Sequence, residues 1–102
     1  MLKTDPILRF LYEAEKAGIL VRDPNGRVEA KKVVELYNTW ASKVNEKALT
    51  QKELTESITR YGIKYVRPKN ITYYVGLKLV VEDRAQEKLD RYLKTKQEEV
   101  EQ

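Results

Sequence analysis

The spacing of apolar residues changes along the chain and divides it into predicted helices and strands. In the first segment apolar residues recur every three or four positions: Ile7, Phe10, Leu11, Ala14 and Ala17. Asp5 and Pro6 precede them, and aspartate can cap the free amides of a helix while proline fits its first turn. The pattern predicts a first helix that begins at Asp5-Pro6 and ends at Gly18.

A second amphipathic segment runs from about Ala30 to Val44. Its apolar face consists of Val33, Val34, Tyr37, Trp40, Ala41 and Val44, which follow a period of 3.6 residues. Asp23-Pro24-Asn25-Gly26, which precedes it, is typical of a turn. We therefore expect an extended connection broken by this turn, with a first, very short strand at Val28.

The stretch LTQKELTESITRYG, residues 49–62, has the signals of a short helix with both ends marked. Thr50 and Glu53 match the capping box, and Leu49 and Leu54 occupy the positions of a hydrophobic staple. Gly62 can supply the left-handed residue that ends a helix. We predict a helix over 50–61 that buries Leu54, Ile58 and Tyr61.

After Gly62 the period becomes two, as in β-strands. IKYVRP and ITYYVGLKLVV are rich in β-branched and aromatic residues, and Pro68-Lys69-Asn70 separates them, which predicts an antiparallel hairpin over 63–79 with a basic tip. Strict alternation would place on one face Ile71, Tyr73, Val75, Leu77 and Leu79. Tyr73 and Tyr74 would then point to opposite faces, one to the core and one to the surface.

From Glu82 onward the pattern is helical again but strongly charged. The apolar residues on one side are Ala85, Leu89, Tyr92 and Leu93. We expect one domain over residues 1–81, followed by a charged helix or tail over 82–102 that frays toward its end.

Composition limits the chemistry that the chain can perform. Its 102 residues can bury one modest core, and it contains neither cysteine nor histidine, which excludes disulfides, thiolate nucleophiles and imidazole bases. Acidic pairs such as Glu13 with Glu15 have lysine neighbours and are expected to face solvent. We therefore expect no enzymatic activity, no metal and no cofactor in this chain. The apolar runs are too short to span a bilayer, so a soluble, cytoplasmic protein without a membrane partner is predicted.

Positive charge is concentrated in the middle third of the chain. The formal net charge is +4, and residues 50–81 alone carry six Lys or Arg side chains against two Glu. Such a cationic segment favours an anionic partner such as nucleic acid, although a solvated strand edge would also carry such charges.

The order of predicted elements is helix, short strand, helix, capped short helix and hairpin. It indicates an α+β fold, a winged helix-turn-helix with a three-helix core, a two-stranded β-hairpin wing and an additional C-terminal helix. In that fold the third helix faces the major groove of double-stranded DNA and the wing lies along phosphates. The outward-facing residues that could contact DNA are Gln51, Lys52, Thr55, Thr59 and Arg60 on the helix and Lys64, Arg67, Lys69, Asn70 and Tyr73 on the wing. Glu56 also points outward; its carboxylate can only accept hydrogen bonds, so it would either favour cytosine or repel phosphate.

Several stretches resemble one known family. DPILRFL, VVELYNTWA, LTQKELTESITRYGI and YYVGLKL are similar to the C-terminal winged-helix DNA-binding domain of phage and plasmid primase-helicase proteins, whose helicase belongs to superfamily 3. The resemblance covers roughly residues 5–81 and implies a plasmid or viral DNA replication module that binds duplex or origin DNA beside a helicase or primase domain. It rests mostly on core and turn positions, and this chain differs from the family at Leu54, where an aromatic residue is common.

Three alternatives remain open at this stage. A winged helix can dock on a helicase ring or an initiator instead of on DNA, and it can also serve as a small transcriptional regulator. The chain could also form a homodimer through its C-terminal helix, using Leu89, Tyr92, Leu93 and Val100.

Overall fold

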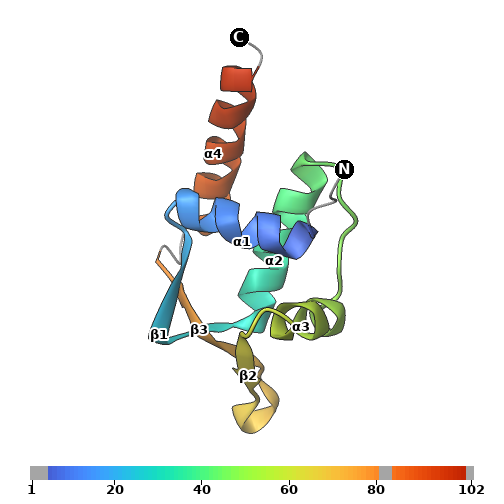
Figure 1. Cartoon of the computed structure of the whole chain (residues 1–102), viewed down its shortest axis with the longest axis vertical. Coiled ribbons are helices and arrows are strands. Elements are labelled where there is room, and N and C mark those ends of the chain that lie inside the picture. Colours follow the sequence, from blue (N-terminus) through green and yellow to red (C-terminus); the bar gives the residue numbers. More distant parts are fainter. Residues whose placement is uncertain (1–4, 81–83, 101–102) are drawn as a thin grey trace.

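The chain folds into a small α+β domain (Figure 1). The computed structural model describes residues 5–80 and 84–100, with side chains up to Lys94. Within these ranges there are four α-helices, one 3-10 turn and one three-stranded antiparallel sheet. In chain order they are α1 (Pro6–Lys16), β1 (Leu20–Glu29), α2 (Ala30–Lys43), α3 (Gln51–Thr59), β2 (Lys64–Val66), η1 (Pro68–Asn70), β3 (Tyr73–Leu79) and α4 (Ala85–Val100). None of the helices in the described ranges combines the length and the apolar character needed to cross a membrane.

The predicted helices are confirmed, and local signals account for their ends. The Asp5 carboxylate accepts a hydrogen bond from the Ile7 amide at 2.9 Å, and Pro6 is the first residue of α1. The helix stops before Gly18, whose φ of 73° is in the left-handed region that favours glycine. Helix α2 has no side-chain cap, but its first amide, that of Ala30, donates to the carbonyl of Thr72 at 2.8 Å.

β3 is the central strand of the sheet, with β1 on one side and β2 on the other. Val28 of β1 and Tyr65 of β2 both lie opposite Tyr74 of β3. The pairing of β2 with β3 confirms the predicted hairpin, and the 3-10 turn at Pro68–Asn70 confirms its tip.

The predicted short strand at Val28 is wrong, because β1 extends over ten residues. The turn residues 23–26 lie within it as an irregularity, at which the register with β3 shifts between Arg22 and Arg27. The amide of Asn25 donates to the Asp23 carboxylate at 2.9 Å, so the turn chemistry is used locally. The flanks nevertheless belong to one strand, because both pair with β3, which is distant in sequence.

The predicted alternation along β3 is also wrong, because it breaks at Gly76. This glycine has a φ of 96°, a conformation that side chains disfavour, and it lies opposite the irregular part of β1. As a result Tyr74 and Leu77 are both buried, while Tyr73 and Val75 are half-buried and Ile71 is exposed outside the strand. A one-residue irregularity of this kind exchanges the two faces of a strand.

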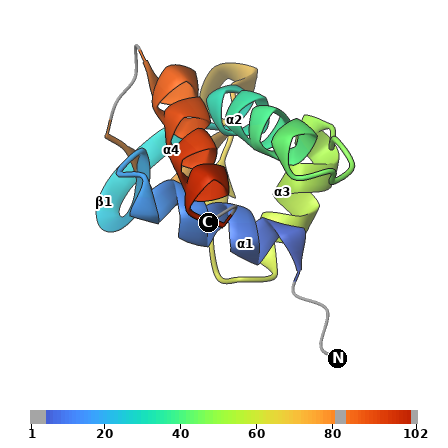
Figure 2. The ribbon, with the colours of Figure 1, turned by 90° about the horizontal axis from the view of Figure 1, so that it is seen from above.

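Aromatic rings form the centre of the core, between α1 and α2. The ring of Phe10 lies edge-on to those of Tyr37 and Trp40, with centroids 5.3 and 5.8 Å apart. Figure 2 shows α1, α2 and α3 arranged around this region when the molecule is seen from above. Burial of the Tyr37 hydroxyl, with the nearby Glu46 and Asp5 carboxylates, raises its pKa. The expectation that Glu13 faces solvent is wrong, because its carboxylate is buried and accepts a hydrogen bond from the indole N–H of Trp40.

Helix α4 packs on α2 and extends the same core. Ala85, Leu89 and Leu93 are buried with the core residues of the other helices, and Lys43 of α2 forms an ion pair with Asp90 at 3.0 Å. Leu89 and Leu93 are therefore not available for the homodimer considered above. The other two residues of that surface are Tyr92, which is half-buried, and Val100, whose side chain lies outside the described set. In Figure 1 α4 extends from the top of the domain, away from the hairpin at the bottom.

Candidate nucleic-acid interface

Helix α3 owes its start to the predicted capping box. The Thr50 hydroxyl accepts from the Glu53 amide at 3.2 Å, and the Glu53 carboxylate accepts from the Thr50 amide at 3.0 Å. The bond from the Thr50 amide lowers the pKa of Glu53. The helix itself covers Gln51–Thr59, and Gly62, with a φ of 84°, follows its end. Glu53 is thus occupied by the cap.

Two contacts between distant residues hold α3 in place. The side-chain amide of Asn38 on α2 donates to the Leu49 carbonyl at 3.2 Å and accepts from the Leu49 amide at 3.0 Å, which fixes the chain just before the helix. After the helix, the Tyr61 hydroxyl donates to the Asp5 carboxylate, and this bond raises the pKa of Tyr61. Neither contact was predicted, because each joins residues that are far apart in the sequence.

The predicted contact residues of α3 do not all face solvent. Gln51, Lys52, Thr59 and Arg60 are exposed. Thr55 is half-buried, and its hydroxyl donates to the Gln51 carbonyl at 2.8 Å and lies 2.8 Å from the Tyr74 hydroxyl. Since Thr55 has a single hydroxyl proton, the Tyr74 hydroxyl must donate to it. Thr55 therefore connects α3 to β3 and is unsuited to reading a base.

Thr59, the other threonine among the predicted contact residues, also uses its hydroxyl proton within the helix. Thr59 donates to the Glu56 carbonyl at 2.9 Å, which leaves only its acceptor lone pairs free. The exposed side chains of α3 that can donate to DNA are consequently those of Gln51 and Lys52, together with that of Arg60, the residue that caps its C-terminal end. Glu56 is exposed between Lys52 and Arg60 at intervals of four residues, on the same stripe of the helix.

The hairpin presents four of its five predicted contact residues to solvent. These are Lys64, Arg67, Lys69 and Asn70. Lys69 and Asn70 adopt left-handed backbone conformations, with φ of 53° and 66°, and the amide of Ile71 donates to the Pro68 carbonyl at 3.0 Å. The tip is therefore a defined turn that projects basic side chains.

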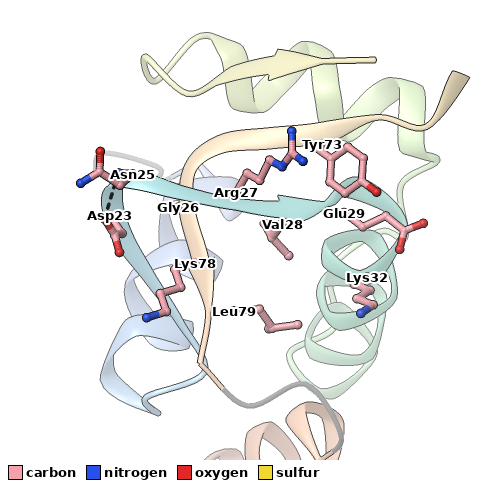
Figure 3. Close-up of a pocket in the computed structure, with 10 residues that line it drawn as sticks. All are labelled: Asp23, Asn25, Gly26, Arg27, Val28, Glu29, Lys32, Tyr73, Lys78 and Leu79. Atoms are coloured by element: carbon pink, nitrogen blue, oxygen red, sulfur yellow. Dashed lines mark hydrogen bonds between the residues drawn. The ribbon is translucent and has the colours of Figure 1, made fainter. Parts of the chain in front are cut away.

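Tyr73, the fifth predicted residue, lies on the other face of the sheet. It is half-buried, and the guanidinium of Arg27 lies over its ring at 4.9 Å from the centroid (Figure 3). Its neighbour Tyr74 is fully buried, and burial raises the pKa of the Tyr74 hydroxyl. The structure thus separates Tyr73 from the α3 side of the sheet.

Tyr73 and Arg27 line an open groove of about 490 Å³ beside the irregular part of β1. Its remaining polar lining consists of the acids Asp23 and Glu29, the cations Lys32 and Lys78, and the neutral Asn25 (Figure 3). Lys78 lies here, beyond Gly76, and not at the tip of the hairpin. Because its charges are mixed, this groove is a poorer candidate for an anion than the hairpin.

Charge distinguishes the segment from the end of α3 through the hairpin from the rest of the domain. From Ser57 to Val81 the sequence has no acidic residue and five cationic ones. None of the exposed cations of α3 and the hairpin pairs with an acidic side chain in the described part of the chain: Lys52, Arg60, Lys64, Arg67 and Lys69. In Figure 1 α3 and the hairpin occupy the same end of the molecule, opposite α4.

Tyr65 was not predicted as a site residue, yet it is 48% exposed on β2. The alternation of the sequence separates Tyr65 from Lys64 and Val66, but which face of the strand is covered depends on how β2 pairs. That pairing involves residues of β3 and could not be read from the strand alone.

Comparison of the chain with protein-family models, with curated protein sequences and with solved structures found no match. Among residues 5–80 and 84–100, the acidic side chains also form no group that could hold a metal ion.

Proposed function

We propose that this chain is a winged helix-turn-helix module that binds double-stranded DNA through α3 and the hairpin β2–η1–β3, its wing. The order of elements and the sheet order β1-β3-β2 support this assignment. The observation that carries it is the acid-free cationic hairpin beside the exposed face of α3. Exposed cations on a projecting hairpin, without an acidic partner among the described residues, suit the phosphates of a duplex.

The two parts of this surface have different roles in the proposal. On α3 and its C-cap the charges of Lys52 and Arg60 are balanced by Glu53 and Glu56. On the wing Lys64, Arg67 and Lys69 have no acidic neighbour in sequence. The wing then supplies most of the electrostatic affinity, which does not depend on DNA sequence, and Gln51, Lys52 and Arg60 supply the few base contacts.

The resemblance to primase-helicase proteins extends the proposal to a biological role. In that role the module holds duplex or origin DNA beside a helicase or primase domain during plasmid or viral replication, and has no catalytic activity of its own. The absence of histidine and cysteine from the sequence is in keeping with a binding role.

Fluorescence anisotropy with a labelled duplex over a range of salt concentrations tests the proposal. We expect measurable binding at low salt and a linear fall of log K with log salt. The combined variant Lys64→Ala, Arg67→Ala and Lys69→Ala should lose three phosphate contacts, which reduces the magnitude of the slope by about 2.7.

A matched control removes the same charge from the other end of the molecule, by combining Lys16→Ala, Arg91→Ala and Lys94→Ala. These residues are exposed on α1 and α4, so the control should keep the slope of the parent chain. Equal losses in the two variants would show that net charge alone attracts the DNA. No binding by the parent chain at low salt would reject the proposal and favour docking on a protein.

A further inference from the structure

Tyr65 is an exposed aromatic side chain on the same side of the sheet as α3. It lies directly opposite Tyr74 in the antiparallel pairing of β2 with β3, and such partners project to the same face. Tyr74 is fully buried, and its hydroxyl lies 2.8 Å from that of Thr55 on α3. Tyr65 is 48% exposed and therefore forms the outer margin of the face that carries α3.

The surroundings of Tyr65 are both cationic and apolar. Arg67 and Lys69, which follow β2 at the tip of the hairpin, are exposed, whereas Lys64, opposite Val75, projects to the other face of the sheet. Ile71, which follows the tip, is 42% exposed and adds apolar surface to the hairpin. A ligand for this surface must offer negative charge and a flat apolar surface together, and a nucleotide with an accessible base has both.

A protein strand added to the free edge of β2 would suit this surface less well. β2 has only three residues and is followed by Arg67 and Pro68, and short edges with charges and proline discourage strand addition.

Within an intact duplex the faces of the bases are covered by their neighbours, so an aromatic side chain can stack only where a base is unpaired.

We propose that Tyr65 stacks on an unpaired base next to a duplex, so that the ligand of this surface is a junction between double-stranded and single-stranded DNA. This inference rests on the proposed function, because α3 and the cations of the wing hold the duplex part. Arg67 and Lys69, which follow β2 at the tip of the hairpin, neutralise the phosphates of the strand that leaves the duplex.

The test compares a blunt duplex with the same duplex carrying a single-stranded tail. The parent chain should bind the tailed DNA about tenfold more tightly, a size typical of one stacked base. Tyr65→Ala should abolish this preference and leave the affinity for the blunt duplex within about twofold, whereas Tyr65→Phe, which keeps the ring, should retain it. Tyr12→Ala is the matched control, because Tyr12 is 60% exposed on α1 and should have no effect.

A second measurement detects stacking directly. A 2-aminopurine base at the first unpaired position should lose fluorescence on binding the parent chain and the Phe variant, but not the Ala variant. Equal affinity of the parent chain for blunt and tailed DNA, or an equal loss of both affinities in Tyr65→Ala, would overturn the inference while duplex binding stands. Failure of the parent chain to bind either DNA would reject the proposed function itself.

Discussion

The indole N–H of Trp40 on α2 donates a hydrogen bond of 2.8 Å to the carboxylate of Glu13 on α1, inside the core. Trp40 is fully buried and Glu13 is 7% exposed. A carboxylate is costly to bury unless it is hydrogen-bonded, so this contact accounts for a charged residue in the position of a core residue. It also joins the two helices between which the aromatic rings pack.

Trp40→Phe should destabilise the domain by more than the loss of ring volume alone. It removes the donor of a hydrogen bond to a charged group, which contributes about 1.5 to 3 kcal/mol. Glu13→Gln should cost less, because the side-chain amide oxygen still accepts from Trp40. Urea unfolding followed by circular dichroism measures both. A Gln variant as unstable as the Phe variant would contradict this account.

Thr50→Ala should lower the free energy of unfolding by about 1 kcal/mol, the usual value of an N-cap. The substitution leaves the Glu53 amide without its partner and frees the start of α3. Glu53→Gln is the control, because glutamine can also close a capping box and should cost little. Thermal unfolding of the three proteins makes the comparison. If Glu53→Gln loses as much stability as Thr50→Ala, then the negative charge of Glu53, and not the hydrogen bonds of the capping box, accounts for the stability of this helix start.

Gly76→Ala should cost about 1 to 2 kcal/mol through the backbone alone. A Cβ at this position would have no atom within 4 Å, but the φ of 96° disfavours any side chain. Gly26→Ala should be harmful for a different reason, because its Cβ would lie 2.9 Å from the Leu77 carbonyl oxygen. Chemical denaturation of both variants tests this. A neutral Gly76→Ala would mean that the strand can exchange its faces without glycine.

Glu56→Gln should strengthen duplex binding in the proposed complex and change stability little. The carboxylate is exposed on α3 between Lys52 and Arg60, and at that position it would repel phosphates that the two cations attract. Glu35→Gln, an exposed acid on α2, is the control. Anisotropy titrations at one salt concentration suffice, and weaker binding by Glu56→Gln would indicate instead that Glu56 accepts from a cytosine amino group.

The domain should lose stability as the pH rises above about 10. The tyrosines whose pKa is raised above the ordinary value of 10.0 are Tyr37, Tyr61 and Tyr74. Above that pH the unfolded chain releases their protons more readily than the folded chain does, so the equilibrium shifts toward unfolding. Tyr74→Phe should make the fall in stability with pH shallower. Urea unfolding at several pH values between neutral and alkaline measures how steeply the free energy of unfolding falls with pH. If Tyr74 does not contribute, Tyr74→Phe leaves this slope unchanged.

The helices and the hairpin could be predicted from sequence because their signals are local. Asp5 with Pro6, and Thr50 with Glu53, satisfy amides within a few residues of themselves. The spacing of apolar residues shows which face of a helix is buried, even when the element that packs against it is unknown. The positions of the wing's cations could likewise be read from the sequence, and Pro68-Lys69-Asn70 predicted the sharp turn that separates the two strands.

Contacts between distant residues decided the rest. The length of β1 and the exchange of faces at Gly76 come from pairing with β3, and Tyr65 and Tyr73 were assigned to opposite faces by that same pairing. The hydroxyl of Thr55 is engaged by Tyr74, and the carboxylate of Glu13 by Trp40. A local pattern states what a residue can do, whereas the partner that satisfies a strand edge or a buried polar group is chosen only when the chain has folded.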